Sequence, residues 1–194
     1  MNHGAPDECP RSIELLSRSD SRLLIVDMQV KLMPAIPVAS DVVGRCRMLI
    51  RGAGVLRMPV DATEQYPEGL GGTVPEIAEL LGDVSSKRRF SCAEVLKWEN
   101  AAASADVRHK IVVAGIEAHV CVQQTALDLM SLGYRVYIPA DAVASRGKLD
   151  WKIALERMAS CGAVITTAES VLFEWCETSA ADEFSQISAL IKEG

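Results

Sequence analysis

Short apolar runs alternate with longer amphipathic segments along most of this chain of 194 residues. The clearest run is 111–115, with the sequence IVVAG, and a similar run lies at 23–26. Continuous apolar runs of this length are typical of strands that are buried on both faces of a parallel sheet. Segment 39–56 has apolar residues near a 3.6-residue period, which indicates a helix between two such strands. This alternation predicts an α/β domain, a three-layer α/β/α structure around a mostly parallel, six-stranded, Rossmann-like sheet.

The remaining elements follow the same alternation. Strands are predicted at about 58–62, 83–85, 134–138 and 163–166, and helices at about 91–103, 118–132 and 150–160, with two more near Ser170 and Ser185. Gly133 is suited to end the helix over 118–132, and Asp150 is suited to begin the helix over 150–160. We expect residues 1–19 to be an N-terminal leader that packs loosely or is flexible, and residues 20–194 to form a single domain.

Charge and cysteine usage argue against several classes of function. The net charge of −6, with no basic run longer than residues 87–89, argues against nucleic-acid binding. The sequence has no stretch of about 18 apolar residues, so we expect no membrane span. Six scattered cysteines without a CxxC motif and three histidines give no zinc-site spacing, and we expect no metal and no cofactor. Free thiols favour a reducing compartment, either the cytoplasm or an organelle matrix.

Two reactive side chains stand where predicted strands end, which is where open α/β sheets bind their ligands. Asp27 directly follows the run at 23–26, although an aspartate there could instead cap a turn. Cys121 lies near the first turn of the helix that follows 111–115. The helix dipole favours a thiolate at that place, and free N–H groups can receive an oxyanion. A buried structural thiol is the alternative interpretation of Cys121.

Several nearby residues have an ordinary structural interpretation beside a functional one. Lys87 could hold a thiol deprotonated, or it could be an exposed lysine. His119 is two residues from Cys121, but such neighbours on a helix point in different directions, so we expect packing or a substrate contact rather than a Cys–His pair. Cys46 and Cys161 lie inside helical patterns and are interpreted as small buried hydrophobic residues.

Two loops also leave the predicted strand ends. Residues 63–67, with the sequence TEQYP, could shape a pocket or simply form a turn before the proline. Asp141, with Ser145 and Arg146, follows the strand at 134–138 in the same manner, and an equally good interpretation is that these residues organise the loop.

Three segments together resemble the isochorismatase-like cysteine hydrolases. They are 24–29 (LIVDMQ), 87–91 (KRRFS) and 115–122 (GIEAHVCV), and they occur in the order typical of that family. The resemblance extends over about residues 20–175, and its third segment is the most specific. Residues 63–67 and 115–124 are similar to the isochorismatase domain-containing subgroup in particular, whose members mostly lack an assigned substrate.

The resemblance implies a hydrolase with an Asp-Lys-Cys triad. Cys121 would be the nucleophile, Asp27 the general base, and Lys87 the cation that lowers the pKa of the thiol. The family also has a non-proline cis peptide bond shortly before the cysteine, which by position is the bond between Ile116 and Glu117. The backbone N–H groups of Glu117 and Cys121 would form the oxyanion hole. The expected reaction is attack on a small amide-type or related C–N substrate, a covalent thioester, and hydrolysis.

Departures from the family pattern limit the substrate. Nicotinamidases of this superfamily carry an Asp/His metal cluster after the second strand, whereas 61–66 holds no histidine, so we predict neither metal nor nicotinamide. Isochorismate-cleaving enzymes generally lack this cysteine, which argues against isochorismate. Asp61 stands where an apolar residue is usual, so the strand ends early or the pocket is more acidic. The candidates for the substrate pocket are Gln29, Thr63, Gln65, Tyr66, Phe90 and His119.

Two alternative functions remain open at this point. The chain could be a binding or scaffold protein that kept the fold without turnover. It could also process RNA, because some relatives carry a ribonuclease label, although the acidic charge gives that function little support. The resemblance further implies a homo-oligomer, a dimer or larger. Apolar side chains near the C-terminus could serve that interface or the core, namely Leu172, Phe173, Trp175 and Phe184.

Overall fold

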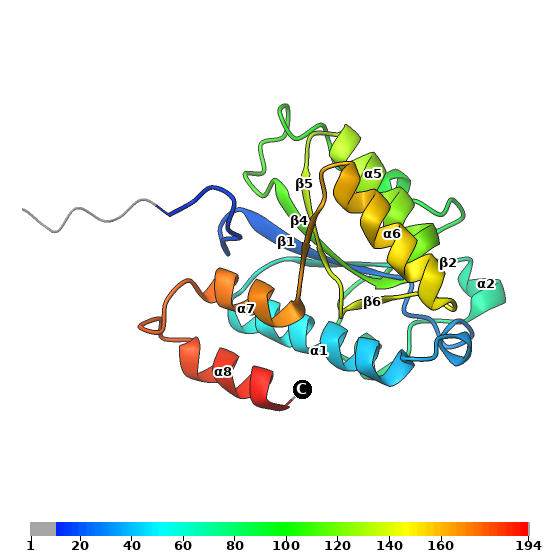
Figure 1. The fold of residues 1–194 in the computed structure, drawn as a ribbon, viewed down its shortest axis with the longest axis horizontal. Coiled ribbons are helices and arrows are strands. Elements are labelled where there is room, and N and C mark those ends of the chain that lie inside the picture. The colour runs from blue at the N-terminus through cyan, green and yellow to red at the C-terminus, as the bar shows by residue number, and fades with distance from the viewer. Residues whose placement is uncertain (1–10, 194) are drawn as a thin grey trace, which may run out of the picture.

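The computed structural model describes residues 11–193, which build an open sheet with helices on both faces (Figure 1). The strands are β1 (Ser21–Val26), β2 (Val60–Gln65), β3 (Ser85–Lys87), β4 (Lys110–Ile116), β5 (Arg135–Pro139), β6 (Val143–Ala144) and β7 (Val164–Thr166). Their order is β3-β2-β1-β4-β5-β7, with β6 beside β4, and all of these pairs are parallel. The three-layer parallel fold is confirmed. The described residues hold seven strands rather than six, because β6 is too short to show a sequence period.

The sheet divides the hydrophobic core into two parts, and helices cover each of them. The longer ones are α1 (Ala39–Val55), α5 (Gln123–Ser131), α6 (Lys148–Ser160), α7 (Ala168–Cys176) and α8 (Phe184–Glu193), and the shorter ones are α2 (Pro67–Leu70), α3 (Pro75–Ala78), α4 (Ala93–Leu96), the 3₁₀ turn η1 (Met33–Ala35) and the π-helical turn η2 (Ala118–Val122). Helices α1, α7 and α8 cover one face of the sheet, and α5 and α6 cover the other (Figure 1). Leu23 and Ile25 of β1 pack on the α1 side, whereas Leu24 and Val26 pack on the α5 side. No helix among residues 11–193 is long and apolar enough to cross a membrane.

The helix predicted over 91–103 is wrong beyond Leu96. Helix α4 ends there, because Lys97 adopts a left-handed backbone with φ of 52°. The apolar side chains that suggested a longer helix pack from a loop instead. Trp98 lies under the guanidinium of Arg22 at 4.4 Å, and the backbone N–H of Ala101 donates to the carbonyl of Leu132. Tertiary packing, rather than helical periodicity, explains these residues.

Strand β2 runs to Gln65, three residues beyond the predicted end at 62. The prediction stopped early because the last residues of the strand are polar, yet they continue the parallel ladder beside β1 and β3. Asp61, at the opposite end of β2, pairs with Arg22 at 3.1 Å. The expectation that Asp61 ends the strand or makes the pocket acidic is therefore corrected. Its carboxylate forms an ion pair near the amino ends of the strands, opposite the ends that carry Asp27 and Lys87.

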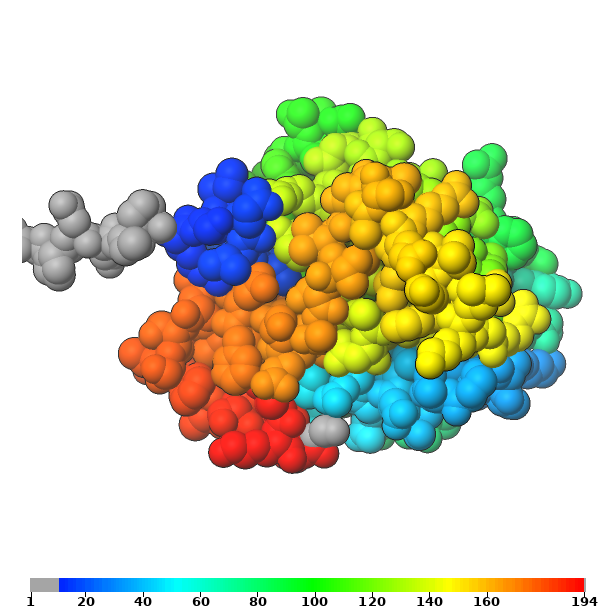
Figure 2. Space-filling view, in the orientation of Figure 1, coloured from blue at the N-terminus to red at the C-terminus, as the bar shows by residue number. Residues whose placement is uncertain are grey.

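The expected leader falls into two parts. Residues 1–10 lie outside the described residues, whereas 11–19 pack against the domain beside α7 (Figure 2). Leu16 is completely buried, Arg11 donates to the carbonyl of Glu174 at 2.6 Å, and Tyr137 donates to the carbonyl of Glu14 at 2.6 Å. The expectation of loose packing is thus corrected for 11–19. The C-terminal apolar residues Leu172 and Trp175 are completely buried in the core, and Phe173 is exposed.

Candidate active site

Asp27 and Lys87 form a buried ion pair at the carboxyl ends of the strands. Asp27 directly follows β1 and Lys87 is the last residue of β3, so the two side chains meet across the end of β2. Lys87 Nζ lies 2.7 Å from Asp27 Oδ2, and neither side chain is exposed to solvent. Sequence reasoning placed both residues at strand ends, and the structure brings them into direct contact.

Every hydrogen-bond partner of the Lys87 ammonium is an oxygen acceptor. Besides Asp27, Nζ donates to Gln65 Oε1 at 2.8 Å, to the carbonyl of Phe90 at 2.9 Å and to that of Arg89 at 3.4 Å. An ammonium has three protons and no acceptor capacity, so this arrangement binds the charged form of lysine. The loop over 88–90 thus holds a fixed positive charge against Asp27.

Gln65 binds the Lys87 ammonium, and Gln29 in turn holds Gln65 in place. Gln29 Nε2 donates to the carbonyls of Gln65 and Gly71 at 2.9 and 2.6 Å, and Gln29 Oε1 accepts from the backbone N–H of Gln65 at 2.7 Å. Gln65 Nε2 donates to the carbonyl of Arg88 at 2.8 Å. Both glutamines are buried. Their amides are thus occupied in orienting Lys87 and its loop, and a contact of either glutamine with substrate stays a prediction.

Thr63 stands directly against the Asp27 carboxylate. Its Oγ1 donates to Asp27 Oδ1 at 2.9 Å and lies 3.3 Å from the Sγ of Cys92, and Thr63 is 1% exposed. Thr63 is therefore a contact of Asp27, and a contact of Thr63 with substrate stays a prediction. Sequence reasoning missed Cys92, because a single cysteine beside apolar residues reads as an ordinary core residue. Its place directly after the segment 87–91 was the available signal.

The backbone at this end of β1 is tightly constrained. Asp27 has a left-handed backbone with φ of 51°, which costs of order 1–3 kcal/mol for a residue other than glycine and is common at functional sites. In the neighbouring strand Gly115 has φ of 118° and pairs with Val26. A Cβ at Gly115 would lie 2.1 Å from the Val26 carbonyl oxygen, so only glycine lets the two strand ends approach.

Cys121 lies in the π-helical turn η2, between the end of β4 and the start of α5. The prediction of a thiol at a strand-to-helix junction is confirmed, although the turn is π-helical rather than α-helical. Single π turns are often found at functional sites. Burial and the negative charge of Asp27 raise the pKa of the Cys121 thiol, and the positive charge of Lys87 lowers it by less. The positive charge of Lys87 therefore acts in the direction that the resemblance implied, but burial and Asp27 outweigh its effect on the pKa of Cys121.

The residues just before Cys121 are held by the loop that follows β6. The peptide bond between Ile116 and Glu117 is cis, as the resemblance implied. Glu117 Oε2 accepts from the backbone N–H and from Nε of Arg146, both at 3.0 Å. His119 Nδ1 lies 2.9 Å from Ser145 Oγ. His119 therefore contacts the loop, in agreement with the structural interpretation of this residue.

The remaining candidates lie around this centre. Tyr66 and Phe90 are 42% and 51% exposed, and the Arg88 guanidinium stacks on the Tyr66 ring at 4.0 Å. Phe90 also lines a surface pocket of about 580 Å³ between the 88–91 loop and α5.

Asp141 accepts from the backbone N–H of Ala168 at 2.8 Å, which supports the loop-organising interpretation. Cys161 is exposed at the end of α6, which corrects its prediction as a buried residue.

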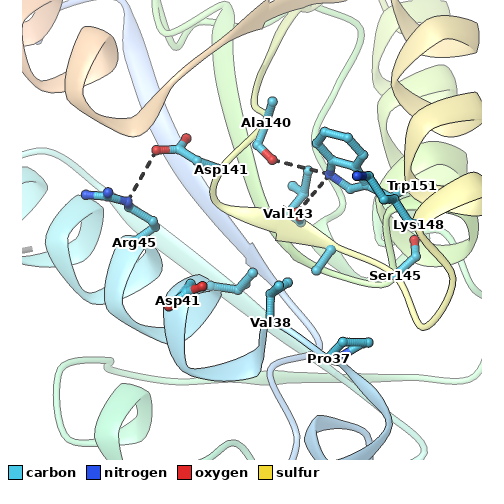
Figure 3. Close-up of a pocket in the computed structure, with 12 residues that line it drawn as sticks. Pro37, Val38, Asp41, Arg45, Ala140, Asp141, Val143, Ser145, Lys148 and Trp151 are labelled. Atoms are coloured by element: carbon cyan, nitrogen blue, oxygen red, sulfur yellow. Dashed lines mark hydrogen bonds and ion pairs between the residues drawn. The ribbon is translucent and has the colours of Figure 1, made fainter.

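A second pocket, of about 560 Å³, opens between the first turns of α1 and α6 (Figure 3). Arg45 and Asp141 form an ion pair at 3.4 Å on its wall, and the Trp151 indole donates to the carbonyls of Ala140 and Val143 at 3.3 and 3.1 Å. Ser145 also lines it and so connects the pocket with His119. The triad residues are not among the residues that line this pocket. Among residues 11–193, no group of three or more histidine, cysteine or acidic side chains is arranged to hold a metal ion.

Comparisons with known proteins identify the family of this chain. The family model of the isochorismatase domain matches residues 21–170, which is most of the chain. The chain belongs to the isochorismatase family. Isochorismatase domain-containing protein 1 of Danio rerio is 41% identical over 179 residues, which cover 91% of this chain. The aligned region is 62% of that protein, so this chain spans about three fifths of its length.

Solved structures of similar proteins have the same fold. A structure described as the MAR1 ribonuclease of Caenorhabditis elegans superposes with a TM-score of 0.84 at 32% sequence identity, covering 92% of each chain. The YcaC protein of Escherichia coli, described as an octameric hydrolase of unknown specificity, superposes with a TM-score of 0.81 at 21% identity, covering 94% of this chain and 91% of that one. The isochorismatase-like hydrolase fold is therefore shown for this chain.

Proposed function

We propose that this chain is a cysteine hydrolase that acts on a small amide-type or related C–N substrate through a covalent thioester. The observation that carries the proposal is the buried Asp27–Lys87 pair, whose charges act on the buried thiol of Cys121. An ion pair without solvent exposure is weak evidence for stability alone, because burying two charges costs about as much as their attraction returns. A carboxylate held beside a thiol can serve as the base that takes the thiol proton. This role gives a catalytic reason for burying the Asp27–Lys87 ion pair.

In the first half of the reaction, Cys121 Sγ attacks the substrate carbonyl carbon while its proton passes to the Asp27 carboxylate. The carbonyl oxygen gains negative charge, which the backbone N–H groups of Glu117 and Cys121 would stabilise. Collapse of this tetrahedral intermediate breaks the C–N bond, and the leaving amine takes the proton from Asp27. Lys87 stays charged throughout and keeps Asp27 oriented.

In the second half, water attacks the thioester carbonyl and gives one proton to Asp27. Collapse of the second tetrahedral intermediate breaks the C–S bond and releases the acid product and the Cys121 thiolate, which takes the proton from Asp27, so the site regains its starting state. The raised pKa of Cys121 fits this sequence. The thiol does not need to be ionised in advance, because Asp27 removes the proton as the sulfur attacks.

Covalent trapping on Cys121 tests the proposal. The protein is incubated with a library of small amides and aldehydes, and adducts are detected by intact mass. We expect an adduct in the native protein and in Cys161→Ala, which removes an exposed thiol away from the site. Cys121→Ala should form none. An equal adduct in Cys121→Ala, or none in the native protein across the library, would remove the proposal in favour of a binding protein of the same fold.

RNA processing is the second candidate, because the relative from Caenorhabditis elegans is described as a ribonuclease. The net charge of −6 argues against it. RNA-binding assays over a range of salt concentrations separate the two functions. We expect no binding at low salt, whereas binding with a steep salt dependence would support RNA processing.

We also propose that the chain forms a homo-oligomer of two or more copies. The octameric state described for the Escherichia coli relative supports this, as do exposed apolar side chains on the outer face of α6, where Leu149 is 70% and Ile153 52% exposed. Sedimentation velocity should give a mass at least twice that of the chain, and Ile153→Glu should lower it. A monomer at all concentrations would contradict this proposal.

A further inference from the structure

We propose that Thr63 is a positioning residue for the reaction and that, with Cys92 behind it, it holds the Asp27 carboxylate ready for the Cys121 proton. This inference rests on the proposed function and adds two residues to it. Thr63 Oγ1 lies 2.9 Å from Asp27 Oδ1 and 3.3 Å from Cys92 Sγ. All three residues are at most 1% exposed, so water does not substitute for these contacts.

A count of protons gives the direction of each hydrogen bond. The Asp27 carboxylate only accepts, so the single hydroxyl proton of Thr63 is donated to Oδ1. The lone pairs of Thr63 Oγ1 then accept from the Cys92 thiol. Burial raises the pKa of Cys92, which keeps that thiol protonated and able to donate. The contacts therefore run in one direction, from Cys92 through Thr63 to Asp27.

The two carboxylate oxygens of Asp27 then have separate partners. Lys87 from β3 donates to Oδ2, and Thr63 from β2 donates to Oδ1. Both bonds favour the charged carboxylate over the acid. They also fix the plane of the carboxyl group, so that its remaining lone pairs stay oriented when the thiol proton arrives. Besides Lys87, the titratable groups around Asp27 are the thiols of Cys121 on η2 and Cys92 before α4.

The same helical segment positions both thiols. The backbone N–H of Cys92 donates to Oγ1 of Thr125 at 2.9 Å. Thr125 lies in α5, which continues directly from the turn η2 that carries Cys121. Cys92, Thr63 and Asp27 are thus joined to the element that places the nucleophile. This connection distinguishes Thr63 from a buried hydroxyl that only satisfies its own hydrogen bond.

When Asp27 is protonated on Oδ1, the Thr63 hydroxyl changes from donor to acceptor by rotation. It accepts the new Asp27 proton and directs its own proton to Cys92 Sγ, whose S–H then turns away. No bond between heavy atoms forms or breaks in this step. The site thus has one hydrogen-bond arrangement for the charged and one for the neutral state of Asp27.

The test compares Thr63→Val, which is close in shape but lacks the hydroxyl, with Thr63→Ser, which keeps it. The readout is the rate of Cys121 alkylation by iodoacetamide from pH 4.5 to 8.5, measured by peptide mass with Cys161 as internal reference. We expect Thr63→Val to slow alkylation of Cys121 about tenfold, the size of one lost hydrogen bond to a charged group, and to move its acid limb to higher pH. Thr63→Ser should remain within about threefold of the native protein.

Equal rates and acid limbs in the native protein and Thr63→Val would overturn the inference. If the valine variant does not fold, Cys92→Ala and Cys92→Ser examine the same contacts from the other end, with a slower rate expected for alanine than for serine. Equal rates for these two variants would likewise overturn it. Failure of the proposed function looks different, because the native Cys121 would then show no dependence on Asp27 or Lys87.

Discussion

The ammonium of Lys87 lies 2.7 Å from the carboxylate of Asp27, and neither side chain is exposed to solvent. Removal of one partner leaves a buried charge without compensation. Lys87→Met should therefore lower the free energy of unfolding by about 3–5 kcal/mol. Urea unfolding at pH 7 measures this change.

The matched control for that variant is Arg88→Ala, next in the chain. Arg88 pairs with Glu68 at 3.3 Å, but both side chains are about two-thirds exposed. An exposed pair contributes about 1 kcal/mol or less, so the control should change stability little. Equal losses for Lys87→Met and Arg88→Ala would contradict the buried-pair interpretation.

The pH dependence of alkylation should distinguish Cys121 from an ordinary thiol. An exposed thiol reacts through its thiolate, whose fraction rises about tenfold per pH unit in the mildly acidic and neutral range. The pKa of Cys121 is raised, so without a base its thiolate fraction would be even smaller than that of an ordinary thiol. Because the Asp27 carboxylate accepts the proton, we expect a rate for Cys121 that is nearly flat between pH 6 and 8.

Two other cysteines supply the controls for this profile. Cys161 is exposed and should show the tenfold rise per pH unit. Cys46 is completely buried, and burial raises its pKa to about 12, so it should not react in the folded protein. A tenfold rise per pH unit for Cys121 would show that hydroxide, rather than Asp27, controls its ionisation.

Gly115→Ala should be strongly destabilising, by about 3 kcal/mol or more, because the new Cβ would lie 2.1 Å from a backbone oxygen and φ is 118°. Gly44→Ala in α1 is the control, since no atom of residues 11–193 lies within 4 Å of the added Cβ. That variant should gain about 0.5–1 kcal/mol through helix propensity. Thermal unfolding of the two variants checks the pair, and a similar effect of both would show that the contact of β1 with β4 is not tight.

His119→Ala tests whether the histidine near the nucleophile acts as its base. The His119 ring contacts Ser145 at 2.9 Å, so we expect the alanine variant to keep the rate of Cys121 alkylation within about threefold of the native value. A loss of a hundredfold or more would show that a Cys–His pair operates instead of the proposed triad. Ser145→Ala serves as the control for effects that act only through the loop.

Strong periodic patterns allowed most of the fold to be predicted from the sequence. The buried strand at 111–115 and the helix over 39–56 lie within one residue of β4 and α1. The end of β2 was missed, because its last residues are polar and make buried contacts around Lys87. The helix predicted after Ser91 was wrong for the opposite reason, since its apolar side chains pack from a loop. Periodicity reports which residues are buried, but it does not report what they are buried against.

The candidate site was predictable to a similar extent. Strand ends and the family resemblance located Asp27, Lys87 and Cys121. The contacts of Thr63 with Asp27 and Cys92 were not accessible from sequence, because hydrogen bonds between side chains 29 and 36 residues apart leave no local pattern. The sequence also provided no measure of how strongly burial of the Cys121 thiol and the nearby Asp27 raise its pKa against the opposing effect of Lys87.

The most direct test of the central claim is the alkylation rate of Cys121 in the native protein and in Asp27→Asn at pH 7, followed by peptide mass. Asparagine keeps the shape of the side chain but cannot take the proton. We predict that Cys121 alkylation falls at least a hundredfold in Asp27→Asn, while the exposed Cys161 reacts at the same rate in both proteins. Equal rates for Cys121 in both proteins would contradict the assignment of Asp27 as the base that activates this thiol.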